Sequence, residues 1–426
     1  MAQAARIELY SGVYLTAVHT KKFKSSVLGA TFLCPLDGEG ASRNALIPSV
    51  LRRGTETHRD MEALEAALDE LYGGTIEPVV RTRGEVQCVG FLGSFLDDAY
   101  TLDGSTVVEP AAALLGELLL SPYKEEGRFC PDYVKGEREN LVERIRAQIN
   151  DKRIYAMTRL RQEMCAGEPF GVDRLGDEAH ASALTAEDLW EGYQELLRTA
   201  PMELYYCGSA QPERVAAALK EALSGLPTDG QRREMPQAVR KSAPETPRYV
   251  EEAMDVTQGK LTMGFRTGCD LLEEGYPALM VANALFGGTT TSRLFLNVRE
   301  KLSLCYYASS QLMKYKDLML VSSGVEFDRF AAARDEILSQ LDQCRRGDFT
   351  DQELESARRS VVSGLRSIPD SQARLEDYWL GQAVSGCGED PAHLARRVEG
   401  VTREAVVAAL GGVALDTIYF LKGKEG

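Results

Sequence analysis

Apolar residues in the first half of the chain follow the two-residue period of strands in several short segments. Residues 7–18 alternate weakly, which is typical of a strand or a hairpin, and residues 27–36 form a second, nearly continuous apolar strand. Residues 75–93 hold two further strands, and the apolar run MELYYCG at residues 202–208 is another. Because neighbouring strands occur in pairs along the sequence, we expect largely antiparallel sheets.

Between these strands the apolar residues follow the helical period. They recur at helical spacing over residues 61–71, and Thr57 is the expected cap of this helix. Pro131 suits a first helical turn, so one long helix is expected from there to about residue 165. Further helices are expected at residues 45–52, 107–120, 186–197 and 212–223.

One segment, residues 287–306 (GGTTTSRLFLNVREKLSLCY), contains both the helical and the strand pattern. Gly287 and Gly288, followed by three threonines, predict a flexible turn, and Ser292 is the expected N-cap of a short helix. A strand follows, so Arg299 is expected near the helix end and Tyr306 at the strand start. On chemistry alone, the favoured interpretation is a packed helix with Arg299 in solvent and Tyr306 filling a gap.

The second half of the chain repeats the plan of the first. Matching stretches begin at Phe129 (FCPDYVKGERENLV) and Phe349 (FTDQELESARRSVV), and each half ends in an apolar strand followed by a glycine. At residues 227–247 prolines and charges replace apolar residues, which predicts a linker, with a long surface loop within one domain as the alternative. The expected fold class is α+β with two duplicated α/β halves, an N-terminal domain at residues 1–226 and a C-terminal domain at residues 248–426.

The amino-acid composition limits the classes of binding partner and the cellular compartment that are expected for this chain. The 49 Lys and Arg residues against 64 Asp and Glu residues give a net charge of −15, which speaks against nucleic acid or an anionic membrane as partner. No window reaches the roughly 18 apolar residues of a membrane span, and the start lacks a signal-peptide pattern. Nine cysteines are scattered singly without a CxxC pair, which is typical of reduced thiols. We therefore expect a cytoplasmic protein.

The residue pattern contains no self-contained active site. The four histidines, His19, His58, His180 and His393, have no second His or Cys within a helical turn, so no local metal site is expected. The Gly287–Gly288 pair is not a phosphate loop, because no Lys follows at the required spacing. No dinucleotide fingerprint or GxSxG motif is present either, so the expected cofactor is none.

The run LFGGTTTSRLFLNVREKLSLCYY at residues 285–307 resembles the C-terminal signature of the pitrilysin/insulinase family of zinc peptidases. The resemblance extends over essentially the whole chain. It implies an insulinase-like fold, similar to LuxS and the mitochondrial processing peptidase, whose halves form a clamshell around a peptide chamber. In that family the C-terminal half contributes an Arg and a Tyr seven residues apart, which reach substrate. Arg299 and Tyr306 have that spacing.

Active members of the family carry an inverted zinc motif, H-x-x-E-H, and the matching stretch here is ALIPSVLRRGT. The resemblance assigns Ala45 and Ser49 to the two His positions and Pro48 to the Glu position. The third ligand position falls on Arg144, in a run that begins at Glu137, with a longer spacing from Ser49 than is usual. Alanine and proline offer no donor, and a serine hydroxyl is a poor zinc ligand. No metal and no catalytic residue is therefore expected on this chain alone.

The combination resembles the non-catalytic subunits of bacterial heterodimeric family members, whose partner supplies H-x-x-E-H. The stretches HTKKFKSSVLG, RNALIPSVLRRGTE and ELYGG are most similar to YfmF-type members, which are associated with 5-aminopentanol modification of elongation factor P. Two hypotheses remain open. The chain is either a pseudo-peptidase subunit that shapes the chamber and presents Arg299 and Tyr306 to the peptide substrate of a zinc-bearing partner, or a peptide- or protein-binding scaffold without a proteolytic role.

Overall fold

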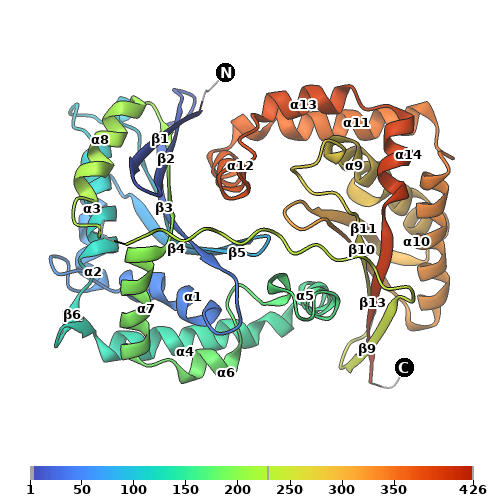
Figure 1. Cartoon of the computed structure of the whole chain (residues 1–426), viewed down its shortest axis with the longest axis horizontal. Coiled ribbons are helices and arrows are strands. Elements are labelled where there is room, and N and C mark those ends of the chain that lie inside the picture. Colours follow the sequence, from blue (N-terminus) through green and yellow to red (C-terminus); the bar gives the residue numbers. More distant parts are fainter. Residues whose placement is uncertain (1–3, 228–229, 425–426) are drawn as a thin grey trace. The chain divides into compact units, whose positions relative to one another are not determined.

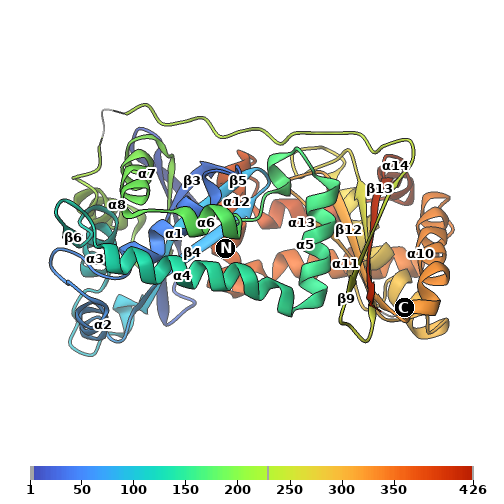
Figure 2. The same ribbon diagram turned by 90° about the horizontal axis from the view of Figure 1, so that it is seen from below.

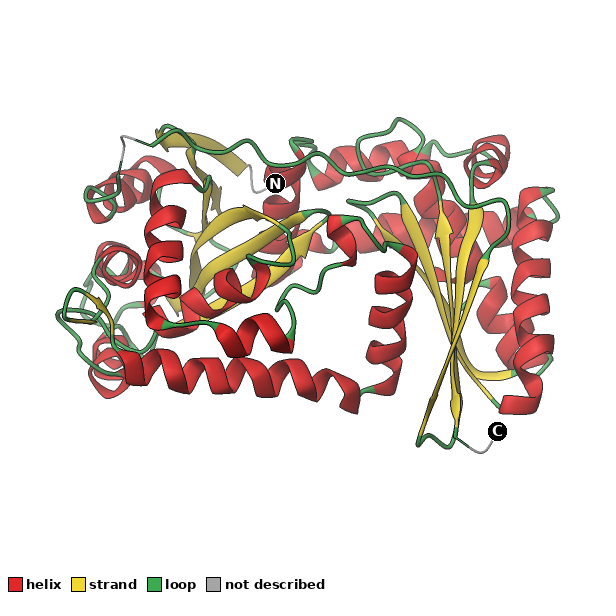
Figure 3. Cartoon of the chain, turned by 60° about the horizontal axis from the view of Figure 1, so that its bottom comes forward, coloured by secondary structure: helices red, strands yellow, loops and turns green. Residues whose placement is uncertain are grey.

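The computed structural model describes residues 4–227 and 230–424, which form two compact units (Figure 1). Unit 1 holds the described residues up to Arg146 together with Val172–Gln237 and Ser371–Val384. Unit 2 holds Ala147–Gly171, Ala238–Asp370 and the described residues from Ser385 onward. Each unit contains one large β-sheet and a set of helices, so the α+β fold class predicted from the sequence is confirmed (Figure 3).

The sheet of unit 1 has six strands in the order β1-β2-β8-β3-β5-β4. Only β2 and β8 run parallel, and the other neighbours are antiparallel. The expected strand or hairpin at residues 7–18 is a hairpin whose turn includes Gly12, with a φ of 69°. The strands are β1 (Ala4–Tyr10), β2 (Val13–His19), β3 (Ser25–Pro35), β4 (Thr75–Arg83), β5 (Val86–Leu96) and β8 (Met202–Gly208).

The sheet of unit 2 has five strands in the order β11-β12-β10-β13-β9. Here β13 and β9 run parallel and all other pairs are antiparallel. Read from its other edge, the order β9-β13-β10-β12-β11 matches β2-β8-β3-β5-β4 strand for strand, including the position of the parallel pair. The predicted duplication and the largely antiparallel sheets are thus confirmed. The strands are β9 (Arg248–Met254), β10 (Gly259–Arg266), β11 (Cys305–Met313), β12 (Leu318–Val325) and β13 (Ala414–Gly423).

The helices of unit 1 pack around its apolar core. Phe32, Phe91 and Leu118 are each at most 2% exposed within that core. Helix α2 begins after Asp60, whose side chain accepts a hydrogen bond from the Ala63 amide, so the expected cap at Thr57 is wrong. The helices are α1 (Ala41–Leu51), α2 (Met61–Glu70), α3 (Val108–Leu120), α4 (Pro131–Ala147), α6 (Glu178–Ala183), α7 (Ala186–Thr199), α8 (Pro212–Ala222) and α12 (Gln372–Ser385), beside the short strands β6 (Lys124–Glu125) and β7 (Arg128–Phe129).

The single long helix expected from Pro131 to about residue 165 is wrong. The chain forms two helices, and Asp151 begins the second by accepting hydrogen bonds from the amides of Arg153 and Ile154. An aspartate at this position favours a new helix start, because its carboxylate satisfies the free amides of the first turn. The helices of unit 2 are α5 (Lys152–Met164), α9 (Tyr276–Asn283), α10 (Phe330–Arg345), α11 (Asp351–Arg366), α13 (Pro391–Glu399) and α14 (Arg403–Gly411).

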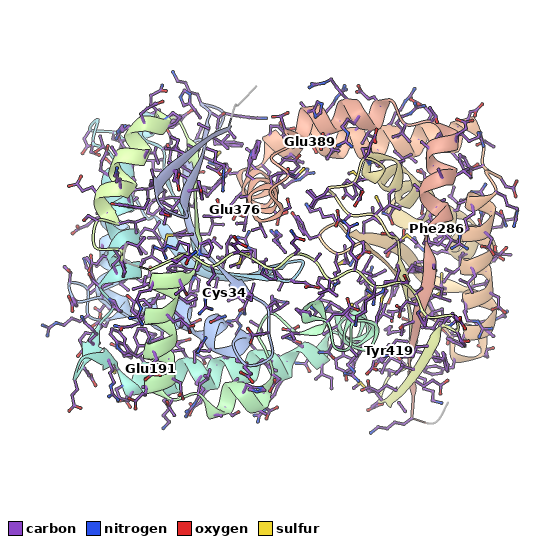
Figure 4. The ribbon with its side chains drawn as sticks, viewed as in Figure 1. Cys34, Glu191, Phe286, Glu376, Glu389 and Tyr419 are labelled. Carbon is purple, nitrogen blue, oxygen red and sulfur yellow. The ribbon has the colours of Figure 1, made fainter. Side chains whose placement is uncertain are left out.

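Two helices pack in the unit that is formed mainly by the other half of the chain. Helix α12 packs in unit 1, where Leu380 contacts the cluster of Leu33 and Cys88 and the Glu376 carboxylate lies 2.5 Å from Arg81. Helix α5 packs in unit 2, where Leu160 shares a buried cluster with Tyr419 of β13. Figure 4 labels Glu376 on α12 and Tyr419 on β13. Position along the chain therefore does not decide alone to which unit a helix belongs.

The predicted linker at residues 227–247 contains neither helix nor strand in its described part, residue 227 and residues 230–247 (Figure 2). The domain boundaries expected at residues 226 and 248 stay a prediction. In the part of the chain that the structure describes, no helix is both long and apolar enough to cross a membrane.

Candidate functional site

Helix α1 holds the three positions that the family resemblance assigns to the H-x-x-E-H motif. Ala45 is 1% exposed and packs in the apolar core of unit 1, and Pro48 is buried within the helix. Ser49 is half-buried. Pro48 also lacks the amide hydrogen that a regular helix residue would donate to the carbonyl of Asn44. This face of α1 offers no nitrogen or carboxylate donor, so the residues present do not fit a zinc ion.

Arg144, at the third ligand position, lies on α4 with an exposed side chain. Glu137, which begins the same run, pairs with Arg53 just after α1 at 3.3 Å. The Arg53 guanidinium also lies 5.0 Å from the ring centre of Tyr133. About 10 Å of helix separates Glu137 from Arg144. Among the described residues, no hydrogen bond or ion pair joins Arg144 to α1.

The rest of the described chain supplies no substitute metal centre. Within residues 4–227 and 230–424, no three His, Cys, Asp or Glu side chains form a group that could hold a metal ion. Seven of the nine cysteines are buried and all are free thiols. Burial raises the pKa of the Cys88 thiol to about 12, so this sulfur stays protonated at neutral pH.

The signature segment of residues 287–306 folds as helical turns followed by a strand in unit 2. It combines the end of the π-helical segment Ala284–Gly288, the π-helical segment Leu294–Lys301 and the start of β11. The N-cap of the second segment is Arg293 rather than the expected Ser292, although the Ser292 hydroxyl accepts a hydrogen bond from the Phe295 amide at 3.4 Å. Segments of π-helix are rare and frequently occur at functional sites.

Close packing, rather than unusual backbone angles, explains the glycine pair of this segment. A Cβ atom on Gly287 would lie 2.6 Å from the Ser310 hydroxyl and 2.7 Å from a methyl carbon of Leu294. A Cβ atom on Gly288 would lie 2.7 Å from the Asn283 amide nitrogen. Neither glycine has a positive φ. The pair thus allows the helical turns to pack against β11.

Arg299 lies near the end of the second π-helical segment, as predicted, with a side chain that is 39% exposed. Its guanidinium carbon is 4.6 Å from the ring centre of Phe295, and its Nε atom is 3.5 Å from the Glu300 carboxylate. Both partners are local neighbours on the same segment. The long cationic side chain therefore remains accessible from solvent, with its guanidinium group over an aromatic ring.

Tyr306 lies at the start of β11 and is 59% exposed, so it does not fill a gap in the core. Its hydroxyl donates a hydrogen bond to the Glu326 carboxylate, and this hydrogen bond raises the pKa of the phenol. The Tyr306 and Glu326 side chains line an open pocket of about 560 Å³ together with Lys152 and Lys260. In the described part of the chain, no hydrogen bond joins Tyr306 to Arg299.

Two residues of this region were missed by the sequence reasoning. Glu326 lies directly after β12, and only the antiparallel pairing of β11 with β12 brings it to Tyr306. Arg293 follows Ser292 and looks like a surface cation in the sequence, but it is 8% exposed. It donates to Glu353 at 3.0 Å and to Gln343 at 2.9 Å, which fastens the π-helical segment to α11 and α10.

The fold and the motif positions on α1, which carry no zinc ligand, define a class of protein: a two-unit α+β chain whose described residues contain no zinc site. The sequence profile described as "Peptidase M16 inactive domain" matches residues 183–361. The chain is 34% identical over 417 residues to the "Probable inactive metalloprotease YmfF" of Bacillus subtilis, covering 98% of this chain and 97% of that protein. The chain therefore belongs to the M16, or insulinase, family as an inactive peptidase homologue.

Solved structures share the whole fold. A conserved protein from Enterococcus faecalis V583 superposes with a TM-score of 0.90 at 24% identity and covers 99% of each chain. The peptidase M16 inactive domain from Pseudomonas fluorescens superposes with a TM-score of 0.78 at 16% identity, covering 99% of this chain and 98% of that one. At these identities the likeness concerns the fold alone. It confirms the insulinase-like architecture that the sequence predicts.

Proposed function

We propose that this chain is the non-catalytic subunit of a heterodimeric M16-type peptidase and presents Arg299 and Tyr306 to the peptide substrate of a zinc-bearing partner. The observation that carries the proposal is the contrast between the two sets of motif positions. Ala45 and Pro48 are buried and offer no donor, whereas Arg299 and Tyr306 are polar and accessible. A protein that had lost every peptidase role would not require Arg299 and Tyr306 at the surface.

The two exposed side chains suit contact with a peptide. The Arg299 guanidinium carries a planar fork of donors that matches a peptide carbonyl or carboxylate. The Tyr306 hydroxyl can donate a hydrogen bond to an oxygen on which negative charge develops during cleavage by the partner. In the structure this hydroxyl is bonded to Glu326, so binding of the peptide would exchange that partner for the substrate oxygen.

The pathway belongs to the same proposal. The likeness to YfmF-type members supports a role associated with 5-aminopentanol modification of elongation factor P, carried out by the heterodimer in the cytoplasm. The name of the Bacillus relative describes only a probable inactive metalloprotease.

The test replaces Tyr306 by phenylalanine and measures peptide cleavage by the reconstituted pair. Removal of one oxyanion donor typically lowers turnover on the order of 10²-fold, while the ring that packs at the site is kept. The matched control is Tyr249→Phe, another exposed tyrosine of unit 2 whose hydroxyl is also bonded to a glutamate. The proposal requires that Tyr306→Phe lowers cleavage and Tyr249→Phe does not, with complex formation equal in both.

A scaffold function is the second candidate, and the Tyr306–Glu326 hydrogen bond favours it. A hydroxyl already held by a carboxylate is less available as a donor to substrate. On this alternative the pocket beside Tyr306 binds a peptide or protein that is not cleaved. Unchanged cleavage in Tyr306→Phe, with the heterodimer intact, would leave the scaffold function as the surviving candidate.

A further inference from the structure

The linker between the two sheets carries three consecutive residues, Val239, Arg240 and Lys241, that are bound by charged side chains of unit 2. The Val239 carbonyl accepts a hydrogen bond from the Lys316 ammonium group. Arg240 donates to the Asp270 and Glu273 carboxylates, each at 2.7 Å. A segment rich in prolines and charges is therefore held at fixed points rather than left free.

The groups that bind these residues are unusually well buried for charges. The Lys316 side chain is fully buried and the Glu168 side chain is 1% exposed, and the two form an ion pair of 2.8 Å. Glu168 also pairs with Arg266 at 2.7 Å and lies 3.7 Å from the Lys241 ammonium group. The linker thus supplies a backbone acceptor and a cation to a buried ion cluster.

The linker is also attached to unit 1, through a different pair of residues. The Arg232 guanidinium donates to the carbonyls of Leu197 and Ala200, at 2.7 and 2.9 Å. The Arg233 side chain pairs with Glu195, and its amide donates to the Thr199 carbonyl at 2.7 Å. These contacts use the end of α7 and are independent of the ion cluster in unit 2.

We infer that Val239–Lys241 is a detachable electrostatic anchor, so that the linker has a docked and a released state. Met235 also packs against the buried cluster of Leu33, Val86, Cys88 and Leu380 in unit 1, so in the docked state the chain without anchoring contacts is limited to residues 236–238. Release of the anchor would extend it to residues 236–247, up to the start of β9. At full extension this lengthens the free chain from about 11 Å to about 43 Å. The anchor therefore determines the length of unattached chain in the linker between the two units.

The partly exposed half of the anchor is the part that can detach. The side chains of Arg240, Glu273 and Lys241 are each 44–45% exposed, whereas Asp270 is 7% and Glu168 1% exposed, so salt screens the Arg240–Glu273 pair most strongly. The buried half, Glu168 with Lys316 and Arg266, lies within unit 2 and keeps its own ion pairs when the linker leaves. Release thus costs the contacts of three linker residues and leaves the sheet of unit 2 intact.

Limited trypsin digestion of the full chain tests the anchor, because trypsin cuts after Arg240 and Lys241 only when this segment is detached. The variant Asp270→Asn/Glu273→Gln removes both carboxylate charges of the Arg240 pairing. The amide oxygen that Asp270→Asn introduces can still accept the hydrogen bond from the Leu272 amide. Mass spectrometry should show cleavage after Arg240 and Lys241 accelerated about tenfold or more. Wild-type cleavage there should rise with salt, once normalised to a small peptide substrate of trypsin.

Two controls make the result specific. Glu355→Gln removes an exposed carboxylate that pairs with Arg358 and Arg359 on α11, away from the linker, and should leave cleavage at Arg240 unchanged. Cleavage after Arg232 and Arg233 in unit 1 should not respond to the double variant. If the double variant loses helix content, Glu273→Gln alone, at an exposed site, replaces it with a smaller expected increase. Equal cleavage after Arg240 and Lys241 in wild type and in folded variants would overturn the inference.

Discussion

The Glu168 carboxylate and the Lys316 ammonium group form an ion pair of 2.8 Å in which both side chains are almost completely shielded from water. Glu168 follows α5, and Lys316 lies in the turn between β11 and β12. Arg266 of β10 completes the cluster, with bonds to Glu168 at 2.7 Å and to Asp416 at 3.0 Å. Charged residues far apart in the sequence thus fix the C-terminal end of α5 to the sheet of unit 2.

Glu168→Gln should therefore destabilise the protein strongly. The amide keeps the size of the side chain but removes the charge that balances Lys316 and Arg266, and breaking a buried ion pair costs about 3–5 kcal/mol. Urea unfolding should show the loss as a lower midpoint. The exposed variant Glu355→Gln should change the free energy of unfolding by less than about 0.5 kcal/mol. Equal midpoints for the two variants would contradict this account of the cluster.

Asp317, next to Lys316, is buried with one carboxylate oxygen that lacks a hydrogen-bond partner, and the residue has a φ of 48°. Burial raises the pKa of its carboxyl group to about 6, against the lowering effect of Lys316, Arg266 and Arg240, while Asp270 raises it further. The folded chain thus binds a proton more tightly than the unfolded chain. Stability is then highest with the group protonated and falls as the pH rises through the window from about 4 to about 6.

Asp317→Asn should stabilise the protein at pH 8 by about 1–3 kcal/mol, because the uncharged amide avoids the burial cost and asparagine tolerates the left-handed backbone. The gain should shrink as the pH falls through about 6 towards about 4. Guanidinium unfolding of both proteins between pH 4.5 and 8 measures it. A gain that stays constant across this range would show that ionisation of Asp317 is not its cause.

Ser303 closes the turn between Arg299 and Tyr306 with a φ of 49°, although it is exposed and not a glycine. A left-handed backbone destabilises an L-residue by roughly 1–2 kcal/mol, and glycine avoids this strain. Glycine also loses more conformational entropy on folding, which offsets part of the gain. Ser303→Gly should therefore raise the free energy of unfolding by about 0.5–1 kcal/mol. Thermal unfolding tests this, with Ser303→Ala as the control that keeps the strain. A lower melting temperature for the glycine variant would refute the argument.

Particular residues show how far the sequence could predict this molecule. The matching stretches at Phe129 and Phe349 identify the duplication, since each Phe lies two residues before the first residue of a long helix, α4 and α11. Helix caps were less predictable, because Thr57 and Asp60 are both good capping residues and only tertiary packing selects Asp60. The break at Asp151 was missed for a similar reason. It is set by where α5 packs, in a unit whose five-stranded sheet comes entirely from the other half of the chain.

The candidate site likewise contains residues that the sequence could predict and one that it could not. Ala45, Pro48 and Ser49 could be assigned from one contiguous motif, and their lack of metal donors follows from their identities. Arg299 and Tyr306 also lie in one segment, so their positions at a helix end and a strand start could be predicted. Glu326 could not, because its contact with Tyr306 depends on the register between β11 and β12, which no local pattern specifies.

Glu326 gives the last prediction, because its carboxylate accepts the Tyr306 hydroxyl and raises the pKa of that phenol. Glu326→Gln keeps an acceptor of the same shape but removes the negative charge, so ionisation of Tyr306 becomes easier and its pKa should fall. Carbon-13 labelling of the tyrosine ring, with the Tyr306 signal assigned by Tyr306→Phe, follows this titration by NMR. Glu251→Gln, which alters the same kind of pair at Tyr249, is the matched control and should leave the Tyr306 titration unchanged. A Tyr306 pKa unaffected by Glu326→Gln would mean that the hydroxyl is not held by this carboxylate in solution and is already free to reach a peptide.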